Sequence, residues 1–172
     1  MALTTNIVVG LQSTNTMKIG NYGDNEATAI DVGLIKGGVH IEYEEAFHDV
    51  KIDQAIGSID KITTDETLKV KTTLAEATLE NLATALGYKT TDVSSSTLNI
   101  GDRQADNYRT IYVNVNGADS TSRKYTFHKC KINPSATHSY KKDGETLFDI
   151  EFEVLIDTTK SQGQRFAQII EA

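Results

Sequence analysis

The sequence predicts a mainly antiparallel β protein with one α-helix lying against a sheet, in the α+β class. Two observations lead to this fold class. Apolar and polar residues alternate in four separate segments, which is the period of half-buried strands. Only one segment has apolar residues at helical spacing. With 172 residues the chain can bury one core, and we expect a single domain over residues 1–172.

Four segments carry the strand pattern, and the clearest one lies near the C-terminus. Every second residue from Phe148 to Ile156 is apolar, and the residues between them are largely acidic. This pattern is typical of an antiparallel strand with one solvated face. The other three segments place their apolar residues at Val39, Ile41 and Tyr43, at Leu68, Val70 and Leu74, and at Ile111, Val113 and Val115.

One segment, from about Ala75 to Leu86, is predicted to form three turns of amphipathic helix. Thr73 and Glu76 have the spacing of a capping box at the start of a helix. Gly87 follows as a natural C-terminal stop, because glycine adopts the left-handed backbone that ends many helices. A helix of this length covers one face of a sheet.

Turn and bulge signals connect the strands of the C-terminal half. Asn-Gly at 116–117 and Asp-Gly at 143–144 each predict a β-hairpin, because these dipeptides favour tight turns. The apolar phase shifts between Phe127 and Cys130, which predicts a bulge at 128–129.

Three stretches lack a clear strand or helix pattern. They are a polar N-terminal arm at about 1–30 and two long loops at about 46–66 and 87–107. Loops of this length are uncommon in compact domains and often carry binding functions. We therefore expect these stretches to make contacts with partners.

Composition argues against several classes of function. The net charge of −7 does not suit a dedicated DNA-binding protein, because counterion release requires a surplus of Lys and Arg. We expect no membrane segment, since no apolar run is long enough to cross a bilayer, and no secretory signal. The lone Cys130 cannot form an internal disulfide, which indicates synthesis in a reducing cytoplasm.

No catalytic or metal-binding pattern stands out. The four histidines are scattered, without the spacing of metal ligands. Asp149, Glu151 and Glu153 form an acidic stripe, but a row along one strand is more typical of a solvated face than of glycosidase carboxylates. We expect no enzyme activity, no cofactor and no metal.

The order of motifs between Asp31 and Gly87 resembles the tail tube proteins of long-tailed bacteriophages. A strand led by Gly-Gly at 37–38, a long connection, a second strand and the segment Glu-Ala-Thr-Leu-Glu-Asn-Leu at 76–82 follow one another as in that family. The acid-rich strand at 148–157 resembles the closing strand of the family. The resemblance extends over about two-thirds of the chain.

This resemblance implies an antiparallel β-sandwich or partial barrel of the tail-tube type. It also implies a structural virion protein whose hexameric rings stack into a hollow tail tube, through which phage DNA is delivered. The implied partners are further copies of the chain and the tape measure, tail terminator and baseplate or tail-tip proteins, with DNA only in transit. The implied location is the tail of the virion, after synthesis in the cytoplasm of the bacterial host.

Two sets of residues are candidates for roles in such an assembly. The acidic side chains expected to face the lumen, where negative charge repels DNA phosphates, are Glu42, Glu44, Asp149, Glu151 and Glu153. The loop residues expected to reach the next ring are His48, Asp53, Ile56 and Asp60. For the acidic set, a solvated outer face is the alternative interpretation.

A different function stays open on the sequence alone. A β-sandwich binding module, carbohydrate-binding or adhesin-like, would use the loops at about 46–66 and 87–107 for recognition. The absence of Trp counts against it, because tryptophan is the usual platform for sugar stacking.

Overall fold

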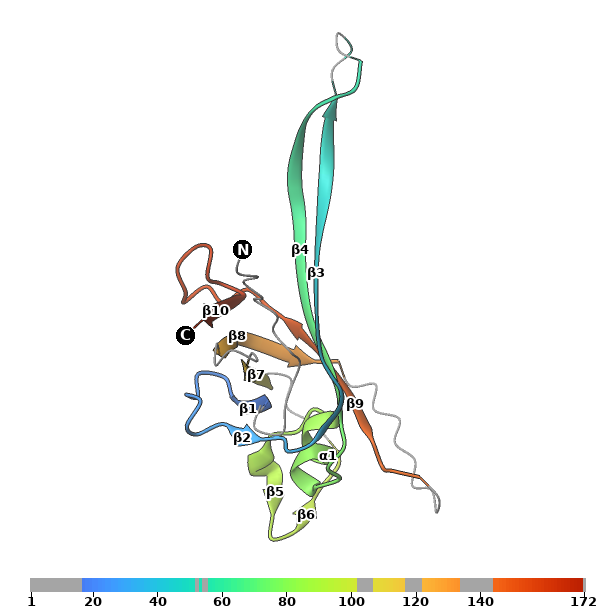
Figure 1. Cartoon of the computed structure of the whole chain (residues 1–172), viewed down its shortest axis with the longest axis vertical. Helices are drawn as coiled ribbons and strands as arrows, with labels where there is room; N and C mark the ends of the chain where they lie inside the picture. The colour runs from blue at the N-terminus through green and yellow to red at the C-terminus, as the bar shows by residue number, and fades with distance from the viewer. Residues whose placement is uncertain are drawn as a thin grey trace, which may run out of the picture.

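The computed structural model describes residues 17–51, 53, 56–101, 107–116, 122–133 and 144–171. These residues form an antiparallel sheet of eight strands with a short helix beside it (Figure 1). The strands of the sheet are β1 (Met17–Asn21), β2 (Ile30–Asp31), β3 (Ile35–Lys51), β4 (Ser58–Leu74), β7 (Tyr108–Asn116), β8 (Ser122–Ile132), β9 (Phe148–Val154) and β10 (Ala167–Glu171). The remaining elements are α1 (Leu79–Ala85), the 3-10 helix η1 (Thr90–Asp92) and the small pair β5 (Val93–Ser94) and β6 (Thr97–Leu98).

The strands follow the spatial order β2-β1-β7-β8-β9-β4-β3, and β10 pairs with β8 outside this path. One edge of β8 pairs with β7, while its other edge is divided between two strands. β10 takes residues 123–127 of that edge, and β9 takes residues 130–132. The change of partner falls at residues 128–129, where the register with β7 shifts, and this confirms the predicted bulge.

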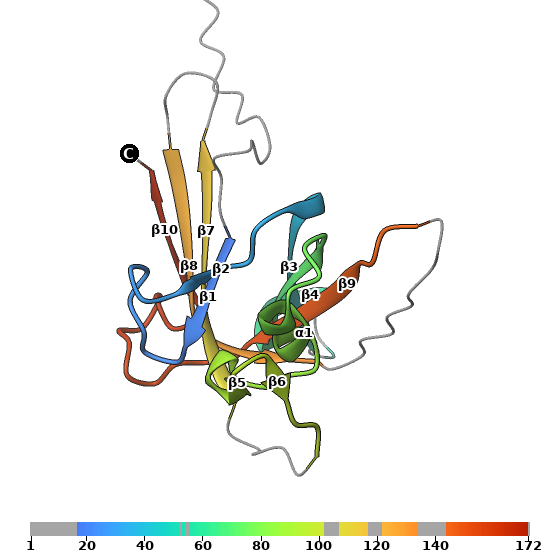
Figure 2. The same ribbon diagram turned by 90° about the horizontal axis from the view of Figure 1, so that it is seen from below.

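Curvature of the sheet turns it into two facing halves around the core (Figure 2). One half is β1-β7-β8-β10 and the other is β9-β4-β3. The largest fully buried side chains come from both halves and are Phe127, Phe148, Phe152, Met17, Leu74, Ile111, Val70, Val113 and Cys130. The predicted fold class, mainly antiparallel β as a sandwich or partial barrel with one flanking helix, is confirmed.

Helix α1 is shorter than predicted and starts later. Its N-cap is Thr78, whose hydroxyl accepts a hydrogen bond from the backbone N–H of Asn81 at 3.2 Å. The predicted capping residue Thr73 lies instead in β4, because β4 keeps its pairing with β9 as far as Leu74. The predicted stop at Gly87 is confirmed by its left-handed φ of 80°.

The predicted loop at 46–66 is wrong, because β3 and β4 run through most of it as one long hairpin. The strands stay in register from Ile35 opposite Leu74 to Lys51 opposite Ser58, with three irregularities. Apolar alternation signals burial of one face, and here neither face is buried against the body. Backbone pairing between β3 and β4 therefore continues beyond the residues in which apolar and polar side chains alternate.

The other two unpatterned stretches also contain structure. Residues 17–21 of the predicted N-terminal arm are β1, with Met17 and Ile19 in the core. The predicted loop at 87–107 contains η1, β5 and β6. Residues 1–16 and 102–106 lie outside the described part of the chain.

Both hairpin predictions fall partly outside the described residues. β7 and β8 do pair as neighbours, with Asn116 opposite Ser122, and residues 117–121 between them are not described. The turn predicted at 143–144 includes Asp143, which is likewise outside the described range. Within that range, no helix has the length and apolar character needed to cross a membrane.

Candidate assembly surfaces

The most prominent surface feature is the distal part of the β3–β4 hairpin, residues 44–67, here called the arm. It extends away from the body of the molecule (Figure 1). β9 supports β4 only from Leu68 to Leu74, and β3 has no second neighbour among the described strands. Both edges of the arm thus lack a strand partner within the part of the chain that the structure describes. Unpaired edges are templates for pairing with other chains.

Large apolar side chains are exposed along the arm. The exposed fractions of Phe47, Ile59 and Ile62 are 53%, 54% and 53%, and Ile56 is fully exposed. Ile62 lies opposite His48, so it is on the other face of the hairpin from Phe47. Apolar surface is therefore present on both faces. A two-stranded hairpin is only marginally stable by itself in water, and exposed apolar patches mark contact surfaces.

The arm is also strongly acidic. Against a net charge of −7 for the whole chain, it holds two lysines, Lys51 and Lys61, and seven acidic residues. The acidic residues are Glu44, Glu45, Asp49, Asp53, Asp60, Asp65 and Glu66. Lys61 lies 3.9 Å from Asp49 across the hairpin, in an exposed pair that contributes little to stability. A single-sign surface of this kind orients the approach of a partner with the opposite charge.

The residues predicted to reach a neighbouring ring all lie in this arm. His48 is on β3 and Asp60 is on β4, and both are exposed. Asp53 and Ile56 lie in the connection between the two strands and are exposed as well. The structure therefore brings all four to the distal half of one projecting element.

The residues predicted to face a lumen share a second surface, the outward face of β3, β4 and β9. Glu42 lies opposite Lys69, which lies in turn opposite Glu153. The neighbouring Lys71 is 2.8 Å from a carboxylate oxygen of Glu42 and 3.4 Å from one of Glu151. Carboxylates on the outer two strands thus flank lysines on the central strand.

The remaining two acidic candidates are on the same face. Asp149 lies opposite Thr73 and accepts a hydrogen bond from its hydroxyl at 2.6 Å. Glu44 lies opposite Thr67 on β4. Lys131 on β8 lies opposite Glu153 and continues the alternation of charge to a fourth strand. We call this surface the charged face.

Hydrogen bonds on the charged face favour the ionised forms of its side chains. The bond to Glu42 raises the pKa of Lys71, and the bond to Glu151 adds to this shift. A bond from Asn133, followed by the bond from Lys71, lowers the pKa of Glu151. The alternation within a single strand does not predict which carboxylates pair with Lys69 and Lys71, because cross-strand register is set by strand pairing.

A third surface lies at the base of the arm, where the C-terminal segment returns to the sheet. A cleft of about 530 Å³ opens there, lined by Tyr43 and Glu66 on the hairpin and by residues 162–163, 165–167 and Ile156 on the other side. The hydrogen bond from Tyr43 to Glu45 raises the pKa of this phenol to about 12. A smaller apolar cleft of about 340 Å³ adjoins Gly37, Gly38, Ile41 and Tyr125.

The described residues hold no cluster of three or more His, Cys, Asp or Glu side chains placed to bind a metal ion. Cys130 is fully buried, and burial raises the pKa of its thiol far above the usual range. A buried thiol of this kind is not activated as a nucleophile.

No protein-family model and no curated protein matches this sequence. Among solved structures, a chain in the cryo-EM structure of the anti-feeding prophage baseplate aligns with a TM-score of 0.55 at 6% sequence identity. The alignment covers 94% of this chain and 95% of that chain, so the two share a fold over nearly their whole length.

Two further alignments have lower scores. A chain in the virion of a native gene transfer agent particle gives a TM-score of 0.46 at 8% identity, covering 82% of this chain and 90% of that chain. A chain in the tube-terminating cap of the anti-feeding prophage gives 0.47 at 10% identity, covering 100% of both chains.

Proposed function

We propose that this chain is a structural protein of a phage or phage-like particle, and that it forms a tail tube by assembling with copies of itself. In this proposal hexameric rings stack into a hollow tube that delivers DNA. The observation that carries self-assembly is the arm, an acidic hairpin with two unpaired edges and apolar side chains on both faces. Such a hairpin needs a partner to bury it.

Two further observations support the particle role. The order of motifs between Asp31 and Gly87 resembles that of tail tube proteins, and the fold is shared with a chain of the anti-feeding prophage baseplate. In the proposed tube, the arm reaches a copy in the next ring through His48, Asp53, Ile56 and Asp60. Tape measure, terminator and baseplate or tail-tip proteins would contact its ends.

The charged face is the proposed lining of the lumen. Its carboxylates, which include Glu42, Glu44 and Glu153, would repel the phosphates of passing DNA. Its lysines lie between these carboxylates, and a lysine engaged by carboxylates releases fewer counterions when DNA approaches. The lining would therefore hold DNA weakly at physiological salt.

The binding-module alternative has less support. It relied on the stretches at about 46–66 and 87–107 as recognition loops. The first is mostly a regular hairpin, and the second contains η1, β5 and β6. The arm, with its unpaired edges and exposed apolar side chains, fits contacts with copies of the chain better than recognition by loops.

Electron microscopy and mass spectrometry test the proposed function together. Particles from the host should contain this chain at a copy number typical of a tube, and the purified chain should form rings or tubes at high concentration. A chain that is absent from particles, or present in only a few copies, contradicts the tube role. The lumen assignment has its own test, which is to time genome release from particles carrying Asp149→Lys with Glu153→Lys, two positions on β9 outside the arm. Unchanged release from normal tubes would exclude it, and Glu80→Lys on α1 is the matched control.

A further inference from the structure

We propose that the arm of one copy docks on the C-terminal surface of another copy. The C-terminal surface is the loop 158–166 together with β10 (Ala167–Glu171). This inference rests on the proposed function, since it names the surface that receives the arm during self-assembly. Three features of the two surfaces support it, namely charge, exposed apolar area and unpaired strand edges.

Charge is complementary between the two surfaces. The C-terminal surface contains Lys160 and Arg165, and its one acidic residue, Glu171, is paired with Arg123 at 3.1 Å. The arm, by contrast, holds seven acidic residues and two lysines. Lys160 and Arg165 are both exposed. No salt bridge joins either of them to a carboxylate within the described ranges, so both charges are available to a partner. Opposite potentials of this kind steer association and select the partner.

The apolar parts of the two surfaces also correspond. Ile169 and Ile170 are 60% and 46% exposed, on opposite faces of β10. Phe47 and Ile62 are exposed on opposite faces of the arm. When two such strands lie edge to edge, side chains on both faces come together, and their burial stabilises the contact.

Unpaired backbone edges allow this edge-to-edge arrangement. β10 pairs with β8 along one edge, and its other edge has no strand partner among the described residues. Residues 58–67 of β4 have a similarly open edge in the arm. A strand added to an open edge gains backbone hydrogen bonds along its whole length. Five residues of β10 fit within this stretch of β4.

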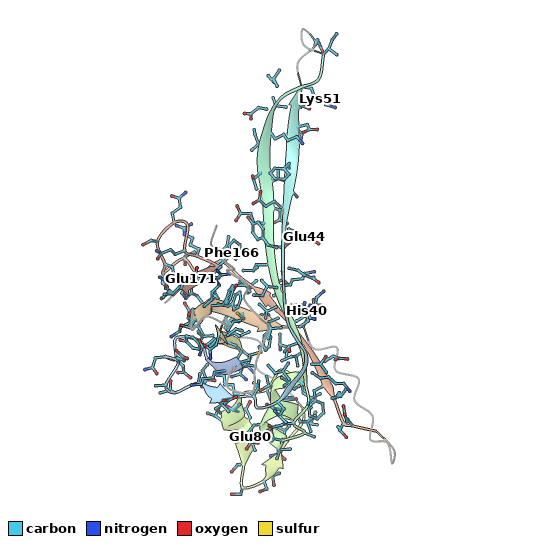
Figure 3. The ribbon with its side chains drawn as sticks, in the orientation of Figure 1. His40, Glu44, Lys51, Glu80, Phe166 and Glu171 are labelled. Atoms are coloured by element: carbon cyan, nitrogen blue, oxygen red, sulfur yellow. The ribbon has the colours of Figure 1, made fainter. Side chains whose placement is uncertain are left out.

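The arm that docks must belong to a second copy. In Figure 3, Lys51 marks the far end of the arm, while Phe166 and Glu171 lie close to the body near the base of the arm. The tip therefore points away from the C-terminal surface of its own chain. A contact between two different surfaces repeats from copy to copy, and it builds rings or filaments instead of closed dimers.

Charge reversal in two separate variants tests the contact. The first variant, Asp49→Lys with Asp60→Lys, reverses the charge of residues 46–63 of the arm, which then hold four lysines and one acidic residue. The second variant, Lys160→Glu with Arg165→Glu, carries an acidic C-terminal surface. Each variant alone should assemble about tenfold less than the wild type, or worse, in sedimentation and electron microscopy at low salt. An equal mixture should assemble again, because each arm then finds a surface of opposite charge on the other variant.

The matched control is Glu80→Lys on the far side of the body, which changes charge outside both surfaces and should assemble like the wild type. Wild-type assembly by either single variant, or a mixture that does not recover, would overturn the docking assignment and leave the proposed function intact. A wild-type chain that never self-associates would instead count against the proposed function.

A second measurement needs no complete tubes. Carbodiimide joins an ammonium group and a carboxylate that are in contact, and it can be applied to a concentrated mixture of isotopically labelled and unlabelled wild-type chains. Mass spectrometry should find Lys160 joined to Asp49, Asp60 or Asp65 of a different copy. Cross-links between copies that join only other surfaces would refute the proposal.

Discussion

The ammonium group of Lys71 on β4 lies 2.8 Å from a carboxylate oxygen of Glu42 on β3. Glu42 is one of the acidic residues predicted to line a lumen, and its nearest charged neighbour is thus a lysine of the adjacent strand. The same lysine also contacts Glu151 on β9 at 3.4 Å. Lys71 therefore links β3, β4 and β9 below the arm, and its removal would leave two carboxylates without their shared counter-ion.

We expect Lys71→Gln to lower the free energy of unfolding only slightly, since the pairs are largely exposed to solvent. The loss should shrink as salt screens the carboxylates from one another. Chemical denaturation at low and high salt measures both effects. The matched control is Lys69→Gln on the same face. An equal loss in that variant would show that Lys71 has no special role.

Removal of the arm should separate assembly from folding. Replacing residues 45–66 by Asn-Gly joins Glu44 to Thr67, which lie opposite each other, through a turn that this dipeptide favours. The free energy of unfolding should change by only about 1 kcal/mol, because the removed residues lie outside the core. Circular dichroism measures folding, and sedimentation should show no assemblies. Assemblies of the usual size would contradict the role of the arm.

Arg109 should be the most sensitive charged residue of the core. Its side chain is 3% exposed, donates to the side-chain oxygen of Asn21 at 2.7 Å and also donates to the carbonyl oxygen of Tyr88. We expect Arg109→Met to cost roughly 2–4 kcal/mol in thermal or chemical denaturation, since both acceptors lose a charged donor. Arg123→Met, at a half-buried position of β8, is the control. Losses of similar size in both variants would show that burial of Arg109 is not the cause.

The pair of Glu26 and Lys124 should make stability depend on pH. Hydrogen bonds from Lys124 and then Asn114 lower the pKa of Glu26 below its ordinary value of 4.5. Such a group stabilises the fold above the unfolded value, and the contribution is lost as the pH falls through the folded value. Glu26→Gln should thus be less stable by roughly 0.5–1 kcal/mol at neutral pH, and the difference should disappear in acid.

Denaturation curves measured across this pH range check the prediction for Glu26. The control is Glu80→Gln on α1, an exposed position outside the ion pairs of the described residues. A constant difference between Glu26→Gln and the wild type, extending well below pH 4.5, would mean that ionisation of Glu26 is not involved.

Much of the sheet could be predicted from period-two alternation. Phe148–Val154 alternates between buried and more exposed residues as its sequence indicates, and the shift of phase at 128–129 marks a real bulge. These predictions succeed because one face of each strand is buried in the core, and burial selects apolar side chains at every second position. The start of α1 was predicted too early, since pairing with β9 keeps Thr73 in β4.

By itself, the sequence determined the fold class, the positions of four strands of the sheet and the acidic character of residues 44–67. Only the tertiary structure decided that these residues form an arm, because both of its faces are exposed and no burial pattern marks it. The structure also decided that Lys69 and Lys71 lie between the acidic strands. Strand order and register are set by contacts between distant segments, and the periodicity of a single strand does not contain them.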